Sequence, residues 1–138
     1  TKDFLYIRNF EPDRWPMGTP TNIGDPQNEP SYEELEHNTF TAYGDLDASP
    51  TKAWMVKHRH EPQWEKHWQL GFEKRPEEEL YDLHKDPDYM NNVADVPAYE
   101  KTRAILSKRL MKTLKETGDP RVQGDGKTFE RPPFVPEE

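Results

Sequence analysis

The sequence contains no cysteine among its 138 residues, which excludes disulfides, cysteine-ligated zinc and thiol catalysis. It is also poor in apolar residues, at 31%, where globular domains usually have about 45–50%, so a thin core is expected. No apolar run approaches the roughly 18 residues that span a bilayer, and the opening Thr1-Lys2-Asp3-Phe4 is not typical of a signal peptide. We therefore expect a chain with no membrane span.

Basic residues are outnumbered by acidic ones, and the formal net charge of -8 opposes a general attraction to nucleic acid or to an anionic membrane. Proline is abundant, with 14 residues, and it occurs alongside 4 tryptophans, 6 tyrosines and 6 phenylalanines. So many aromatic rings are not typical of a disordered polymer. Aromatic anchors in proline-stiffened loops favour a segment that packs against another surface.

Two short strands and one long helix are predicted around a less regular middle. Aromatic and β-branched residues predict a strand at about 3–10, and a second strand is expected at about 78–83. A strand so near the first residue needs a neighbour, and we expect part of its sheet to lie on residues outside this sequence. A stripe of period 3.6 predicts a helix at about 97–117, before Gly118-Asp119-Pro120. The stripe consists of Tyr99, Thr102, Leu106, Leu110, Met111 and Leu114.

Residues 11–75 are expected to hold loops and short helices. Five prolines make 11–30 a long stiff loop. A capping box at Ser31 predicts a helix at about 31–43, and Ser49-Pro50 predicts the start of a helix that ends before Pro62. A further helical piece is expected at 63–70, and residues 122–138 are predicted to be a polar tail or a surface arm. The apolar face expected for the first helix comprises Tyr32, Leu35, Thr39, Phe40 and Tyr43.

Residues 51–75 form a positively charged zone within this acidic chain. Six cations stand against three carboxylates there, a net of +3 that leaves -11 for the remainder. Cations bind sulfate and flat rings stack on pyranoses, so this zone with its three tryptophans is a candidate for meeting a sulfated sugar. Structural packing of the tryptophans is the alternative. The cations are Lys52, Lys57, Arg59, Lys66, Lys74 and Arg75, and the tryptophans are Trp54, Trp64 and Trp68.

Metal and catalytic motifs are not found. His58, His60 and His67 resemble a set of zinc ligands, but no H-E-x-x-H motif occurs and Pro62 would break the helix that such a motif needs. A solvated or loop-packed face is the favoured reading of these histidines. The aspartates at 82–88 resemble a calcium loop, yet Pro87 and Val93 stand where an EF-hand needs glycine and glutamate. We therefore predict no catalytic residue and no metal ligand in this chain.

Two stretches carry a resemblance to a known family. Arg75-Pro76-Glu77-Glu78-Glu79-Leu80-Tyr81-Asp82-Leu83, followed by Asp86-Pro87 and Asn91-Asn92-Val93-Ala94-Asp95, is similar to a signature near the carboxyl end of type I sulfatases. Phe4-Leu5-Tyr6-Ile7-Arg8-Asn9-Phe10 with Pro12-Asp13-Arg14 resembles the strand and turn that precede it in that family. The end of the predicted last helix, Glu116-Thr117-Gly118-Asp119-Pro120, resembles the heparan N-sulfatase (sulfamidase) branch of that family. The resemblance covers residues 1–16 and 49–121.

The resemblance implies an α+β fold and an incomplete enzyme. The chain would be the C-terminal sulfatase subdomain, residues 1–121, in which a small antiparallel sheet packs on a long C-terminal helix among extended loops. An α/β domain upstream would carry the catalytic centre, where formylglycine attacks the sulfur of a sulfate ester or N-sulfate beside a calcium ion. Ser49-Pro50 lacks the spacing of the formylglycine motif, so no nucleophile is carried over and the chain alone is expected to be inactive.

Several further expectations follow from the resemblance. The partners would be the N-terminal catalytic segment and a sulfated carbohydrate, and the location would be periplasmic or extracellular. Residues 50–75 would lie near the substrate entrance. Two other functions are alternatives to a sulfatase segment: a non-catalytic secreted glycan-binding module and a small zinc protein. The residues expected at the rim of the substrate pocket are Lys57, His58, Arg59, His60, Trp64, His67 and Trp68.

Overall fold

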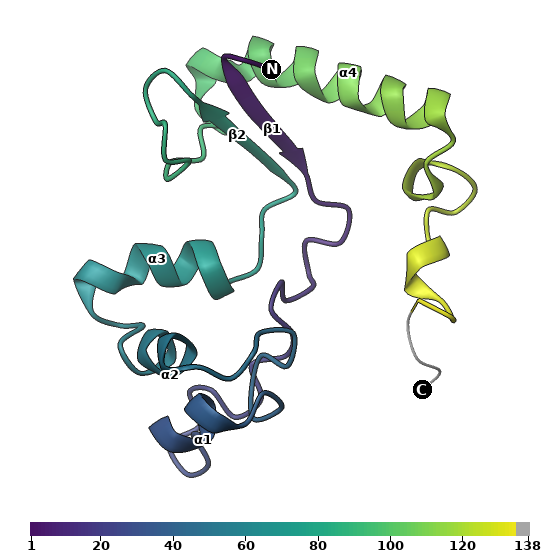
Figure 1. Ribbon diagram of the computed structural model, residues 1–138. Helices are drawn as coiled ribbons and strands as arrows, with labels where there is room; N and C mark the ends of the chain where they lie inside the picture. The colour runs from purple at the N-terminus through teal and green to yellow at the C-terminus, as the bar shows by residue number, and fades with distance from the viewer. Residues whose placement is uncertain (135–138) are drawn as a thin grey trace. The chain divides into compact units, whose positions relative to one another are not determined.

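The computed structural model describes residues 1–134, and the last four residues of the predicted tail, 135–138, lie outside the described part. The described chain has mixed α and β structure, with a two-stranded antiparallel sheet and four α-helices. It divides into two compact units (Figure 1): unit 1 comprises 1–10 and 77 onwards, and unit 2 comprises 11–76. No helix among the described residues has the length and apolarity needed to cross a membrane.

The sheet of unit 1 joins two segments that are far apart in the sequence. Strand β1 (Phe4–Arg8) pairs with β2 (Glu78–Asp82) in antiparallel register, with Tyr6 opposite Leu80. Both strands lie inside the predicted ranges but are shorter than expected. Leu80 and Tyr81 are buried and provide most of the small core of this unit.

Helix α4 (Glu100–Thr117) is the long helix that the apolar stripe predicted, and it follows a single 3-10 turn, η1 (Pro97–Tyr99). Its C-cap Gly118 has φ 73°, a left-handed conformation that glycine adopts without strain. The helix packs on β1. No residue of α4 is fully buried, so its apolar stripe is only partly covered by the described residues.

Two short 3-10 turns follow α4: η2 (Pro120–Val122) ends where the predicted tail begins, and η3 (Thr128–Glu130) lies within the tail. Asp119 accepts two hydrogen bonds from the Arg121 guanidinium, at 2.9 and 2.6 Å. The guanidinium carbon of Arg121 lies 5.8 Å from the ring centroids of both Phe10 and Phe129. These contacts attach the beginning of the tail to unit 1 as a surface arm.

Unit 2 contains α1 (Tyr32–His37), α2 (Pro50–Lys57) and α3 (Pro62–Phe72). The capping box at Ser31 is present: its hydroxyl accepts a hydrogen bond from the Glu34 amide, and Glu34 accepts one from the Ser31 amide. Ser49 caps α2, with Pro50 in the first turn, as the sequence predicted. The core comprises Leu35, Ala42, Tyr43, Ala53, Val56, Trp68 and Phe72, with Met17, Ile23, Leu46 and Met55 packed against it.

The prediction of a helix at 31–43 was wrong, because α1 ends at His37. The Asn38 side chain accepts a hydrogen bond from the Phe40 amide, an interaction that competes with helix continuation. Buried Lys52 then donates to the carbonyls of Thr39, Tyr43 and Leu46, at 2.9, 3.4 and 3.1 Å. Its ammonium therefore satisfies carbonyls of an irregular loop, and the expected helical face does not form.

The side chains of that expected face go in different directions. Phe40 is 87% exposed, whereas Tyr43 is 1% exposed and has φ 51°. Tyr43 packs edge-on against Trp68 and Phe72, at centroid distances of 5.7 and 5.2 Å. Burial raises the pKa of Tyr43 to about 12.

Candidate functional site

The residues expected at a substrate rim lie close together in unit 2, because they occupy the end of α2, the turn that follows and α3. His58 is the C-cap of α2 and Glu61 is the N-cap of α3, and His58 Nδ1 lies 2.5 Å from Glu61 Oε1. His60 in the intervening turn is exposed. The short turn therefore brings the predicted residues into one neighbourhood.

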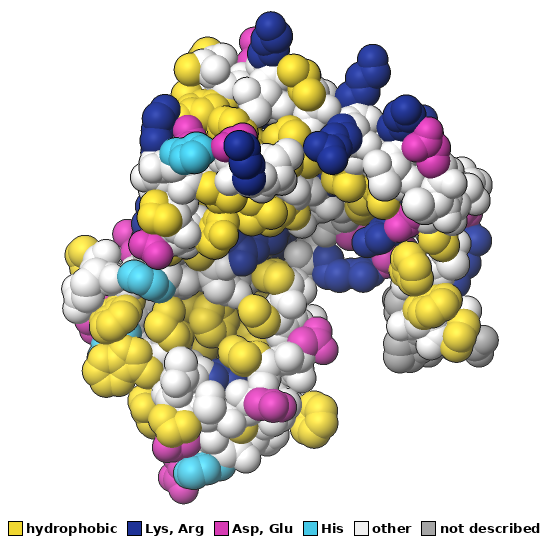
Figure 2. Space-filling model, turned by 45° about the horizontal axis from the view of Figure 1, so that its top comes forward, with side chains coloured by type: hydrophobic (Ala, Val, Ile, Leu, Met, Phe, Trp, Pro, Cys, Tyr) yellow, Lys and Arg dark blue, Asp and Glu magenta, His cyan; other side chains and the backbone are white. Residues whose placement is uncertain are grey.

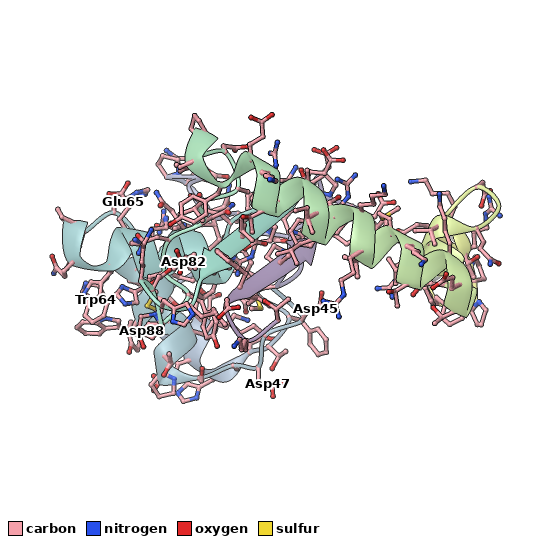
Figure 3. The ribbon with its side chains drawn as sticks, turned by 90° about the horizontal axis from the view of Figure 1, so that it is seen from above. Asp45, Asp47, Trp64, Glu65, Asp82 and Asp88 are labelled. Carbon is pink, nitrogen blue, oxygen red and sulfur yellow. The ribbon has the colours of Figure 1, made fainter. Side chains whose placement is uncertain are left out.

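Four exposed or half-buried rings form an aromatic cluster, which we define as Trp54, His58, Trp64 and His67. The Trp54 and His58 rings stack at a centroid distance of 3.8 Å, an i, i+4 contact on α2. Trp64 meets Trp54 edge-on at 6.4 Å and lies 5.9 Å from His67. Trp54 is 43% exposed, and Figure 3 shows Trp64 projecting from the outside of α3. This aromatic cluster offers flat surfaces to solvent.

Trp68 does not belong to the aromatic cluster. It is 7% exposed and stacks on Phe72 at a centroid distance of 4.3 Å within the core of unit 2. Its position gives it a packing role, and its ring presents no open face for a sugar. The expectation that Trp68 lines a substrate rim is therefore replaced by a role in the core.

The cations expected to meet sulfate are already engaged inside unit 2. Arg59 Nη2 donates to Glu29 Oε1 at 2.5 Å, and Lys57 Nζ lies 3.7 Å from Glu29 Oε2. Lys57 also donates to the carbonyl of Pro30 at 2.5 Å, and Arg59 to that of Val56 at 2.6 Å. Burial opposes ionisation of Glu29, but hydrogen bonds from the Gly24 amide and Arg59, with the nearby Lys57 charge, lower its pKa.

Three other cations of the positive zone also have partners inside unit 2. Lys52 binds the three loop carbonyls, Arg75 donates to the carbonyl of Leu70, and Lys74 lies 5.4 Å from the centroid of the Trp15 ring. Five of the six cations of 51–75 therefore have partners inside unit 2. Sequence reasoning missed Glu29, since no local pattern indicates that a carboxylate about thirty residues away is the partner of Arg59.

The histidines do not form a metal site in the described part of the chain. No group of three or more His, Asp or Glu side chains within residues 1–134 is arranged to hold a metal ion. The aspartates that resembled a calcium loop also have other contacts. Asp82 accepts hydrogen bonds from Tyr99 Oη and the His84 amide, and Asp86 accepts them from the Met90 and Asn91 amides. These contacts are typical of turns.

The stretches with the family resemblance meet in unit 1. Tyr6 Oη donates to Glu78 Oε1 at 2.5 Å, and Asn9 Nδ2 donates to Glu79 Oε1 at 2.9 Å. The other oxygen of the buried Glu79 carboxylate accepts from Tyr81 Oη at 2.5 Å. Arg8 forms an ion pair with Glu77. The residues that looked like a signature thus join β1 to β2.

A second group of contacts holds β2 to the elements that follow it. Asn92 Oδ1 accepts from the Leu80 amide at 2.9 Å, and Asn92 Nδ2 donates to the Glu78 carbonyl at 3.2 Å. Tyr99 Oη donates to Asp82 Oδ2 at 2.8 Å and accepts from Lys85 at 2.8 Å. The hydrogen bond from Tyr99, with the His84 amide and the nearby Lys85 charge, lowers the pKa of Asp82. The signature residues form a structural framework, and none of the contacts pairs a nucleophile with a base.

Comparisons with known proteins identify no relative. No protein-family model, no curated protein and no solved structure matches this chain. The resemblance to the sulfatases therefore depends on the quoted residues and on their spacing.

Proposed function

We propose that this chain is the C-terminal part of a type I sulfatase, in which it completes the fold and contributes to the rim of the substrate pocket. The observation that carries the proposal is the pair of sequence stretches at 4–14 and 75–95 with their spacing. The hydrogen bonds between Tyr6 and Glu78 and between Asn9 and Glu79 support it, because they give these residues one common structural role.

The catalytic centre belongs, under this proposal, to a preceding α/β segment that supplies formylglycine and binds calcium. The substrate is a sulfated carbohydrate, cleaved at a sulfate ester or an N-sulfate, in the periplasm or outside the cell. Rim contacts would come from the aromatic cluster and exposed His60. Lys57 and Arg59 are less suited to sulfate, because they would have to leave Glu29.

The test is to purify the native protein and to examine it for a larger segment that carries formylglycine. Mass spectrometry detects the aldehyde, and release of inorganic sulfate from a sulfated glucosamine and from an aryl sulfate measures activity. We expect activity only when that segment is present. Sulfate release by this chain alone, or native protein without a formylglycine segment, would contradict the proposal.

A non-catalytic glycan-binding module is the second candidate function. The exposed ring of Trp54 beside Trp64 favours it, since tryptophan faces stack on pyranose rings. A glycan array probed with the full chain tests this candidate. Binding that Trp54→Ala abolishes, in native protein that lacks a catalytic segment, would favour the module over the sulfatase.

A further inference from the structure

Four exposed lysines share one side of α4, and we name them the lysine row: Lys101, Lys108, Lys112 and Lys115. A helix turns by about 100° per residue, so these four side chains leave the axis within about 60° of one another. The rise of about 1.5 Å per residue spreads the row over about 21 Å. Figure 2 shows Lys and Arg side chains projecting along this helix. The lysine row is therefore a straight line of positive charge on the surface of an acidic chain.

The lysine row lies on the side of α4 that is opposite to the sheet. Arg103 Nη1 lies 3.6 Å from Glu78 Oε2 of β2, and Leu106 and Leu110 line a cavity together with residues of β1. These three residues lie about 150–170° around the helix axis from the middle of the row. Packing of α4 on the sheet therefore does not use the lysine row.

The stability of the helix does not account for the lysine row either. Lys108 and Lys112 are four residues apart and Lys112 and Lys115 are three apart, and like charges at these spacings destabilise a helix. A cation complements the helix dipole only near the last turn, which contains Lys115. Lys101 stands in the first turn, where a cation is unfavourable. The dipole thus explains one of the four lysines.

Ion pairing inside the fold leaves most of the row unneutralised. The sequence has 27 acidic residues, yet within residues 1–134 Lys101, Lys108 and Lys115 form no ion pair. Lys112 Nζ lies 3.6 Å from Glu116 Oε1, but these side chains are 73% and 64% exposed, so their pair contributes little. The row therefore offers its charges to a ligand without breaking buried contacts.

We propose that the lysine row binds a stretch of a sulfated glycan chain. Sulfate groups along a linear sugar chain complement ammonium groups along a line. A single-stranded nucleic acid fits less well, because its bases need aromatic platforms and the interval in the row holds only Ala104 and Ile105. The net charge of -8 also opposes a broad polyanion such as a duplex, which would extend beyond the row. Ile105 is 57% exposed and can contact the C–H face of a sugar ring.

This inference deepens the proposed function, and it rests on that function in one respect. Identification of the bound glycan as the substrate of the sulfatase requires the catalytic segment. The row would then hold sugar units beyond the one that is cleaved, so the substrate class would be a sulfated polysaccharide. Binding of the glycan to α4 does not itself require catalysis.

The experiment titrates the isotope-labelled full chain with a heparin-derived octasaccharide and follows the amide resonances by NMR. We expect the largest chemical-shift changes between Lys101 and Lys115. Raising the salt concentration from about 50 to 200 mM should weaken binding by about ten-fold or more, because several ion contacts are lost together. An oligothymidylate of equal charge serves as the comparison ligand and should bind more weakly.

Variants of the lysine row test the contribution of its charges. Lys108→Gln, Lys112→Gln and Lys115→Gln together should weaken octasaccharide binding by about ten-fold or more. Lys108→Arg, Lys112→Arg and Lys115→Arg together keep the charges and should leave the affinity within about three-fold. The shift map uses the unchanged chain, so it tests the location of binding even where a variant does not fold.

The matched control changes the net charge by the same amount away from the row. Lys2→Gln, Lys66→Gln and Lys127→Gln remove three exposed lysines from other parts of the chain. Because the row stays intact, the affinity of this control for the octasaccharide should fall by less than about three-fold.

Four outcomes would overturn the proposal: no binding of the octasaccharide, equal losses in the row and control variants, shift changes confined to the aromatic cluster, or an oligothymidylate that binds as tightly. The proposed function fails separately. Sulfatase activity whose KM for a sulfated polysaccharide is unchanged by the three glutamine substitutions in the row would remove the glycan surface alone. Octasaccharide binding to α4 in a native protein without formylglycine would remove only the sulfatase assignment.

Discussion

Replacing Lys52 by methionine is the sharpest test of how unit 2 is stabilised. Lys52 is 1% exposed, and its ammonium donates to three carbonyls of the loop that follows α1. Methionine keeps a long apolar side chain in the same space but has no donor. The variant therefore removes the hydrogen bonds with little change in packing.

The expected cost follows from the positions of the three carbonyls. A buried carbonyl that loses its last donor costs about 1–3 kcal/mol, but the Tyr43 carbonyl, whose bond to Lys52 is buried, keeps a hydrogen bond from the Leu46 amide at 2.9 Å. The carbonyls of Thr39 and Leu46 are only partly buried, so water replaces part of the loss. Burial also lowers the pKa of Lys52, and removing the ammonium removes that desolvation. We expect Lys52→Met to lower the free energy of unfolding by about 1–2 kcal/mol.

Urea unfolding followed by tryptophan fluorescence measures this change, because Trp68 lies against Tyr43 in the same core. The matched control is Lys112→Met on α4, where the side chain is 73% exposed and lies 3.6 Å from Glu116. The control should cost less than about 0.5 kcal/mol, the range of a surface helix pair. Equal unfolding midpoints for the two variants would refute the reasoning, since the loop would then not depend on the ammonium.

Three other outcomes are expected. Trp68→Ala should lower the free energy of unfolding by about 3–5 kcal/mol because it leaves a cavity. Trp54→Ala, at a ring that is 43% exposed, should lower it by less than about 1 kcal/mol. Similar urea midpoints for the two variants would contradict the buried position of Trp68 and the exposed position of Trp54. The pKa of Tyr43 is raised from 10.0 to about 12, so the folded chain keeps a proton that the unfolded chain loses. The contribution of the Tyr43 hydroxyl to stability is complete below pH 10.0 and should be lost as pH rises through about 12. The Tyr43→Phe variant has no hydroxyl to titrate and should not show this loss. A flat stability profile of the unchanged chain in this range would count against the burial of Tyr43. Hydrogen bonds from Arg121 lower the pKa of Asp119 from 3.8 to about 2, so the contribution of this carboxylate is present above pH 3.8 and lost as pH falls through about 2. Asp119→Asn should remove that acid dependence and speed amide hydrogen exchange at 120–130, and unchanged exchange would show that the arm is held by other contacts.

The helices and strands were predictable where their signals are local. The capping box at Ser31, the proline after Ser49 and the apolar stripe of α4 act within a few residues, and the structure contains each of them. The prediction of a helix at 31–43 was wrong because Lys52, which binds the Thr39 carbonyl, lies outside that segment. Local propensity gives way when a buried group elsewhere in the chain takes the carbonyls that a helix would use.

The candidate site was predictable as a neighbourhood but not in its chemistry. Spacing along α2 and α3 was enough to bring Trp54, His58 and Trp64 together. It did not reveal that Trp68 faces the core or that Glu29 holds Arg59 and Lys57. A net charge counted along the sequence does not distinguish a cation that faces solvent from one that has an internal partner.

The sequence by itself determined the caps of α1 and α2, the C-terminal end of α4 and its apolar stripe, because backbone sterics and contacts within one or two helical turns decide them. Tertiary structure alone decided that β1 pairs with β2, that Lys52 supports a loop and that Glu29 pairs with Lys57 and Arg59. These interactions join residues distant in the chain, and their partners become identifiable only when the folded backbone brings them within hydrogen-bonding distance.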